Sequence, residues 1–337
     1  MDPISQGIVG AALAQSKAKK NNIIKIGVIG FMAGMVPDLD VLIKSSTDPI
    51  LSLEYHRQFT HSLLFIPFGA MIVALMIFPL IKRSLSFKTV YLASFLGYAT
   101  HGLLDACTSY GTLLYWPLSN ERVTWNSISV VDPLFTIPII VLVLTAMITR
   151  KRLFSFFAIG WMTFYLLLGF VQYERALSVA TELAHSRGHK PERLTLKPSF
   201  GNLILWKSIY QYEERFYVDA IRTTRSSTWC LGENIRVFDY QYHLPNLEKD
   251  SQQRKDIERF RWFSQDYLGF DDDKNLVTDV RYSMIPNQIA PMWGLVIDVK
   301  RGMKEHAIWW TSRGLEQSQL SLFKDMLSGK KCINNQR

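Results

Sequence analysis

The sequence predicts an α-helical integral membrane bundle in residues 1–171, followed by a soluble α+β domain with an antiparallel sheet in residues 172–337. Residues 62–81 form an uncharged apolar run of about the ~20 residues that a spanning helix needs. The hydrophobic content is 48% and the mean hydropathy is +0.05. These intermediate values for the whole chain are averages over an apolar half and a polar half. Beyond residue 172 charged, aromatic and turn-forming residues become frequent, as in soluble domains.

Four apolar segments are expected to cross the bilayer: residues 62–81, 89–108, 133–149 and 153–171. The segment 89–108 also carries His101 and Asp105. Ionisable groups at membrane depth are costly, so this helix is expected to face protein rather than lipid. Two shorter arms, 4–16 and 23–37, are too short for a hydrocarbon core of ~30 Å and are expected to insert partly or to pack against the bundle.

Basic residues concentrate in the short loops 82–88 and 150–152, which are therefore predicted to be cytoplasmic. The formal charge of +9 is explained largely by such loops and does not indicate nucleic-acid binding. The same topology predicts a multi-pass membrane protein in which residues 172–337 are extracytoplasmic. The N-terminus lacks the basic region and small-residue cleavage pattern of a removable signal peptide.

In the soluble half, alternating apolar and polar residues predict strands at 202–210, 215–222, 276–282, 293–299 and 306–311. Residues 250–268 have the spacing of a helix. Asp271, Asp272 and Asp273 lack the glycine and glutamate spacing of a calcium loop and indicate a solvated turn. The cysteines Cys107, Cys230 and Cys332 have no paired or metal-like spacing, so we expect inert thiols.

Ionisable residues gather next to the apolar segments. His101 and Asp105 are four residues apart, so on a helix they share one face and can grip one cation. His56 and His61 flank Arg57 at the start of the long apolar run. Each pair alone has an ordinary explanation, such as a cap, a surface residue or a structural hydrogen bond.

Asp38 and Asp40 follow Pro37, which ends the preceding helical pattern and leaves both carboxylates at a bend. Asp132 before Pro133 is more simply a helix cap. Taken together, the pairs predict a metal centre at the outer membrane face. Its expected ligands are Asp38, Asp40, His61, His101 and Asp105. Imidazole and carboxylate together suit zinc, manganese or iron.

An ordered set of motifs in the first 150 residues resembles a known family: Met1-Asp2-Pro3, Gly10-Ala11-Ala12, Pro37-Asp38-Leu39-Asp40, His56-Arg57, Thr60-His61-Ser62, His101 with Asp105, Tyr110-Gly111-Thr112 and Asp132-Pro133. The set is similar to that of the bacterial inner-membrane family of membrane-bound metal-dependent hydrolases, itself distantly similar to zinc-dependent phospholipases C. The resemblance implies a helical protein of the bacterial inner (plasma) membrane with a His/Asp metal centre, in which zinc is the expected ion. Where that family usually has a histidine near its N-terminus, this chain has Gln6, a poorer ligand.

We therefore expect a hydrolase in which a metal-activated water attacks an ester or phosphoester, with a lipid-linked substrate as one candidate. His56 is expected to be a ligand or general base, Arg57 to stabilise negative charge, and Asp105 to complete the catalytic set. The alternative, which Gln6 favours, is a non-catalytic envelope protein with a degenerate metal site and an exported partner-binding domain. A transporter would need ionisable residues spread through the membrane depth.

Overall fold

The computed structural model describes residues 1–312, 314, 316–330 and 333–334. Its contacts divide the chain into two compact units. The first, here called the helical unit, contains Met1–Ile43, Tyr55–Val171 and Phe200–Asn202. The second, here called the sheet unit, contains Lys44–Glu54, Gln172–Ser199 and the described part of Leu203–Arg337. The predicted boundary at residue 171 agrees with this division except for two short segments. Lys44–Glu54 precedes the boundary but belongs to the sheet unit, and Phe200–Asn202 follows it but belongs to the helical unit.

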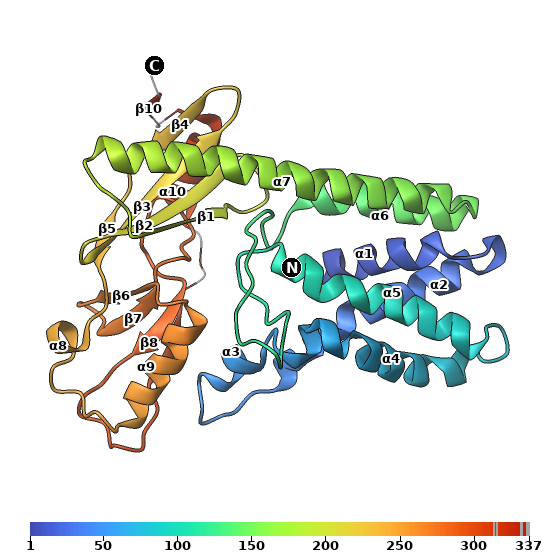
Figure 1. Cartoon of the computed structure of the whole chain (residues 1–337), viewed down its shortest axis with the longest axis horizontal. Helices are drawn as coiled ribbons and strands as arrows, with labels where there is room; N and C mark the ends of the chain where they lie inside the picture. Colours follow the sequence, from blue (N-terminus) through green and yellow to red (C-terminus); the bar gives the residue numbers. More distant parts are fainter. Residues whose placement is uncertain (313, 315, 331–332, 335–337) are drawn as a thin grey trace. The chain divides into compact units, whose positions relative to one another are not determined.

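The helical unit is built from α1 (Pro3–Ser16), α2 (Ile23–Met35), α4 (Ile66–Ile81), α5 (Phe87–Ala106), α6 (Pro133–Thr149) and the first part of α7 (Leu153–Ser186). Side-chain caps define several helix starts. Ser86 accepts from Thr89 at the start of α5, and Asp132 accepts from the two backbone amides that open α6. The predicted helical membrane part is therefore present (Figure 1).

Among the residues that the structure describes, three helical segments are long and apolar enough to cross a membrane: Lys20–Leu42, Leu63–Ile81 and Leu153–Ser186. The first corrects the expectation for residues 23–37. Short 3-10 turns at Lys20–Asn22 and Val36–Leu42 extend α2 at both ends, so the segment reaches 23 residues. Helix α5 packs against α1, α2 and α4, as expected of a helix that carries ionisable groups inside the bundle.

Glycines let three helices approach closely. A Cβ atom on Gly10 of α1 would lie 2.5 Å from the carbonyl oxygen of Gly30 in α2, and one on Gly97 of α5 would lie 2.3 Å from the same atom. Small residues at such crossings allow backbone contact between helices in a membrane. The C-terminal end of α2 is thereby held against the half of α5 that carries the candidate ligands.

The antiparallel pairing predicted for this half is confirmed, but the described strands form two sheets where the sequence predicted one. The first has the order β1-β2-β3-β4-β10, with β5 also paired to β3. Its strands are β1 (Arg193–Pro198), β2 (Leu205–Tyr212), β3 (Arg215–Thr223), β4 (Ser227–Cys230), β5 (Asn234–Arg236) and β10 (Ile333–Asn334). The second sheet consists of β6 (Leu268–Asp271), β7 (Leu276–Asp279), β8 (Trp293–Val296) and β9 (Ile308–Thr311).

Helices complete the sheet unit. The C-terminal half of α7 packs on the first sheet, where Ala176 and Ala180 contact a core that includes Trp206 and Ile221. The predicted helix at 250–268 is shorter and forms α9 (Gln252–Phe263), because Ser264 caps it and the chain continues into β6. Helices α3 (Leu51–Tyr55), α8 (Tyr240–His243) and α10 (Gln317–Ser328) were not predicted.

The cysteines differ from one another. Cys107 is free and buried, as expected. Cys230, at the end of β4, is disulfide-bonded, so the expectation of an inert thiol is wrong at this position. Sequence spacing gave no sign of the bond because disulfide partners need only be close in space. Cys332 lies outside the described residues.

Candidate metal centre

Four side chains from three elements of the helical unit converge. Asp38 comes from the 3-10 turn that extends α2, His61 from the turn Phe59–His61, and His101 and Asp105 from successive turns of α5. His61, His101 and Asp105 are fully buried, whereas the side chain of Asp38 is 18% exposed. The structure therefore brings together four of the five predicted ligands around one point.

The facing atoms of this group have nearly equal spacing. His61 Nε2 lies 2.9 Å from His101 Nε2, 3.2 Å from Asp105 Oδ2 and 3.5 Å from Asp38 Oδ1. His101 Nε2 lies 3.3 Å from Asp38 Oδ1 and 3.7 Å from Asp105 Oδ2. Zinc–ligand bonds of about 2.0–2.1 Å place the donors of a regular tetrahedron about 3.3 Å apart. Five of the six separations among the four donor atoms are therefore close to those around a tetrahedral ion of this size, and the sixth, between Asp38 and Asp105, is within 4.8 Å.

The outer ring nitrogens fix the orientation of both histidines. His101 Nδ1 lies 2.5 Å from the carbonyl oxygen of Gly34, which can only accept a hydrogen bond. A neutral His101 therefore turns the lone pair of its Nε2 atom into the site. His61 Nδ1 contacts Asp40 Oδ2 at 3.3 Å and Thr60 Oγ1 at 2.9 Å. Such outer partners hold the rings of metal-binding histidines in place.

Asp40, the fifth predicted ligand, lies behind His61. One of its oxygens is 2.7 Å from His56 Nδ1, and the other accepts from the backbone amide of Arg57 at 3.0 Å and from Thr60 Oγ1 at 2.8 Å. Asp38, Asp40 and His56 also form a second group with mutually close donor atoms. In this position Asp40 can orient the rings of His56 and His61. It can also serve as a ligand to a second ion.

The carboxylate of Asp105 is held on both sides. Its Oδ1 atom accepts from Gln6 Nε2 at 2.8 Å and contacts the amino group of Met1. Its Oδ2 atom lies 3.1 Å from Arg57 Nε but accepts no well-aligned hydrogen bond among the described residues. The amide of Gln6 thus steadies Asp105, and its buried Oε1 atom likewise has no described partner. Asp105 Oδ2 and Gln6 Oε1 are thus buried acceptor oxygens that a cation or a water molecule can satisfy.

Arg57 is unusual in its backbone. Its φ angle is +63°, a left-handed conformation that costs a non-glycine residue about 1 kcal/mol or more. Its buried guanidinium donates to Thr108 Oγ1 at 3.1 Å and lies 4.9 Å from the centre of the Tyr110 ring.

His56 is more accessible than Arg57, with 21% of its side chain exposed. Asp38 and His56 are therefore the members of the cluster that solvent reaches.

The cluster favours positive charge at its centre. Burial lowers the pKa of His61, but hydrogen bonds and charges from the carboxylates of Asp105, Asp38 and Asp40 outweigh burial and raise this pKa to about 10. Groups that stabilise an imidazolium in this way also stabilise a metal cation that replaces the proton.

Several residues near the site have structural roles. Asp132 caps α6, as expected, and accepts from Tyr165 at 2.9 Å. Gly111 has a φ angle of +93° in the turn after α5. Sequence reasoning missed Gly34 and Thr108 because a backbone carbonyl and a lone threonine leave no pattern. Thr60, next to His61, was noted only as part of a motif.

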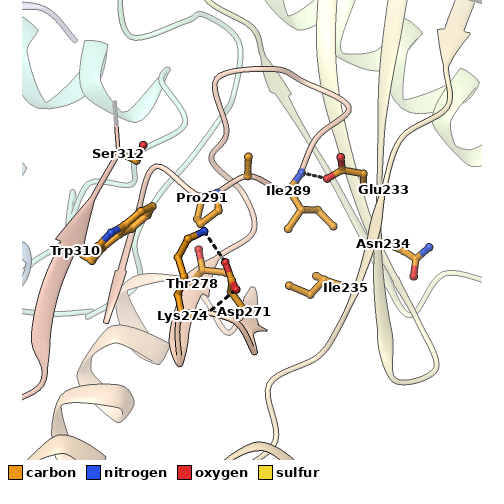
Figure 2. A pocket seen from close by; sticks show the side chains of 11 residues that line it. Glu233, Asn234, Ile235, Asp271, Lys274, Thr278, Ile289, Pro291, Trp310 and Ser312 are labelled. Atoms are coloured by element: carbon orange, nitrogen blue, oxygen red, sulfur yellow. Dashed lines mark hydrogen bonds and ion pairs between the residues drawn. The ribbon is translucent and has the colours of Figure 1, made fainter. Parts of the chain in front are cut away.

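A separate hollow of about 550 Å³ lies in the sheet unit between residues such as Ile235, Ile289 and Trp310. Figure 2 shows that its charged side chains already have partners. Lys274 Nζ lies 2.9 Å from Asp271 Oδ2, and Glu233 accepts from the backbone amide of Ile289 at 2.8 Å. Among the described residues, two groups of mutually close metal-ligand atoms lie in the helical unit, and a third, Asp48, Asp256 and His306, lies in the sheet unit outside this hollow.

Comparison with known proteins gives one family. Residues 1–176 match the model of the YdjM inner membrane protein family. No curated protein and no solved structure matches the chain at a significant level. The family match includes every helix that carries a candidate ligand. Because it covers more than half of the 337 residues, the chain belongs to the YdjM inner membrane protein family.

Proposed function

We propose that the chain is a membrane-bound metal-dependent hydrolase whose ion is held by Asp38, His61, His101 and Asp105. The observation that carries the proposal is that five of the six separations among these four donor atoms lie between 2.9 and 3.7 Å, close to tetrahedral spacing. Two imidazoles and two carboxylates suit zinc, with manganese or iron as alternatives. When bound, such an ion lowers the pKa of water and polarises an ester or phosphoester oxygen.

His56 is the proposed general base. Asp40 engages its Nδ1 atom at 2.7 Å, which leaves the Nε2 atom able to take a proton, and the ring is partly open to solvent. Arg57 is buried against Asp105, so its guanidinium positions that carboxylate and adds positive charge beside the reacting centre. The side chains thus divide into ligands, a base and supporting groups.

The surroundings favour a substrate that is carried by a lipid. In the 3-10 turn Val36–Leu42, Asp38 and Asp40 alternate with apolar residues whose side chains are largely exposed. Leu39 is 57% exposed and Val41 is 50% exposed. Exposed apolar side chains next to inward-facing ligands suit a site reached from the acyl boundary of a bilayer. We propose an ester or phosphoester at a lipid headgroup as the substrate class.

We further propose that the sheet unit is extracytoplasmic. The basic loops 82–88 and 150–152 support this orientation. The disulfide at Cys230 is a second support, because disulfides persist in the bacterial periplasm and are rare in the cytosol. Reporter fusions at the 82–88 loop and at the C-terminus should report opposite sides of the membrane. The same side for both would refute this topology.

The function is tested on detergent-purified protein. Elemental analysis should find near-stoichiometric metal in the parent and in Asp132→Asn, and little in His61→Ala or Asp105→Ala. His56→Gln should keep the metal and lose most hydrolysis of bis-p-nitrophenyl phosphate or of phospholipid vesicles. A parent without metal, or full hydrolysis in Asp105→Ala, would refute the hydrolase.

One observation favours a second function. Four protein donors complete a tetrahedron, whereas catalytic zinc sites keep one position open for water. A closed site would stabilise the bundle without catalysis, in an envelope protein whose sheet unit binds a partner. In that case metal would bind with the same ligand dependence, but hydrolysis would be equal in metal-loaded, metal-free and His56→Gln protein.

A further inference from the structure

The segment Lys44–Glu54 belongs to the sheet unit, although the chain on both sides of it belongs to the helical unit. We call this segment the strap. It begins four residues after Asp40 and ends two residues before His56. These two side chains meet at 2.7 Å, so the strap closes the loop between two residues of the metal centre.

Arg259 of the sheet unit forms ion pairs with two residues of the strap, Asp48 and Glu54. Arg259, on α9, donates through Nε and Nη2 to the two carboxylate oxygens of Glu54 at 2.6 and 2.9 Å. It also donates through Nη1 and Nη2 to the two oxygens of Asp48, both at 2.9 Å. Bidentate pairs of this kind combine charge with a fixed geometry.

Both partners of this clamp are themselves fixed. Asp48 Oδ1 also accepts from the backbone amides of Ile50 and Leu51, which starts α3, and Ile50 is completely buried. On the other side, α9 buries Phe260 and Phe263 in the sheet unit. The ion pairs are about three-quarters buried, with Arg259 at 23% exposure, so solvent screens them less than surface pairs.

We propose that Arg259 is a positioning residue for the metal centre: it holds the strap so that Asp40 and His56 meet in the geometry that orients His61. A free loop of this length would have many conformations in which the two side chains do not meet. The catalytic consequence rests on the proposed hydrolase function, whereas the effect on metal binding does not require catalysis.

The test uses the full-length protein in detergent and zinc alone as the probe. Arg259→Gln should weaken zinc binding about 10-fold, in the range known for lost outer partners of metal ligands. Lys255→Gln, an exposed change on the same helix, should leave it unchanged. The double variant Asp48→Asn/Glu54→Gln should match Arg259→Gln, and combining all three changes should add little, because they remove one interaction.

Two further readouts separate positioning from general damage. The absorption spectrum of Co²⁺-loaded Arg259→Gln should differ from that of the parent, and Arg259→Lys, which keeps the charge but not the fork, should be intermediate. Hydrogen exchange should rise in both the strap and residues 55–61. Raised exchange in the strap with unchanged zinc affinity and Co²⁺ spectrum would overturn the proposal. If the parent binds no metal, the proposed function fails, and unchanged exchange at 55–61 in Arg259→Gln would then overturn the positioning role.

Discussion

Replacing Asp40 by asparagine tests whether the residue behind His61 tunes the metal centre. The substitution keeps the shape of the side chain but removes its charge. One carboxylate oxygen lies 3.3 Å from His61 Nδ1, and the other lies 2.7 Å from His56 Nδ1. Because an amide nitrogen cannot accept a hydrogen bond, the side chain introduced by Asp40→Asn can serve at most one of these rings in the present geometry. Whichever ring the amide oxygen faces, the partner of His61 loses the negative charge that raises the basicity of this ring.

The expected loss of zinc affinity is 10- to 100-fold, the usual effect of removing an outer partner of a ligating histidine, which corresponds to about 1.4–2.7 kcal/mol. If Asp40 binds the ion directly, the loss of zinc affinity should be larger, because a metal–oxygen bond would disappear. The size of the effect thus distinguishes the two positions that the structure allows for Asp40.

The assay is a competitive zinc titration with a chromophoric chelator, performed on detergent-purified protein. Asp132→Asn is the matched control, because Asp132 is also a buried, hydrogen-bonded carboxylate of the helical unit but lies outside the metal cluster. Equal affinities of the parent and Asp40→Asn, or an equal loss in Asp132→Asn, would refute the reasoning that Asp40 acts through His61.

Three other predictions follow from the structure. Gly102→Ala should destabilise the protein by about 1–3 kcal/mol and weaken zinc binding, because its Cβ atom would lie 2.2 Å from the carbonyl oxygen of His61; Gly160→Ala, with open space around the new methyl group, is the control in thermal unfolding. Burial lowers the pKa of Lys207 to about 7, so between that pH and ~10 the unfolded chain carries a proton that the folded chain lacks, and stability rises with pH. Lys207→Met should flatten this rise by up to about 1.4 kcal/mol per pH unit, measured by pulse proteolysis in urea, whereas the exposed Lys190→Met should not. Chelation should lower the melting temperature of the parent but not of His61→Ala, since a ligand present at about 1,000 times its Kd stabilises the folded state by about 4 kcal/mol; equal melting curves with and without chelator would count against a bound ion.

Much of the candidate site was predictable because its signals are local. His101 and Asp105 share a helix face by their spacing alone, and the structure places both in the cluster. Asp38 and His61 lie next to apolar segments whose burial makes an unpartnered charge costly. The two-sheet domain was predictable for a similar reason, since alternation of apolar and polar residues is a property of each strand by itself.

The remaining features depend on contacts that a single sequence does not encode visibly. The carbonyl oxygen of Gly34 orients His101 from 67 residues away, and every residue carries such a carbonyl. The clamp of Arg259 on Asp48 and Glu54 joins positions more than 200 residues apart. The length of the segment around α2 was underestimated because 3-10 turns continue it past Pro37, where the helix pattern ends.

The protonation of the two histidines supports the proposal that the cluster holds a cation. His101 Nδ1 must donate to the carbonyl of Gly34, so its Nε2 atom can carry a proton only if the ring is charged. His61 Nε2 faces it at 2.9 Å, with the carboxylates of Asp38 and Asp105 beside the pair. Without a metal, one proton can bridge the two rings, but Asp105 Oδ2 then still accepts no well-aligned hydrogen bond among the described residues. A divalent ion at the same point would contact all four donors at once, beside the positive charge that Arg57 and the amino group of Met1 already bring to Asp105.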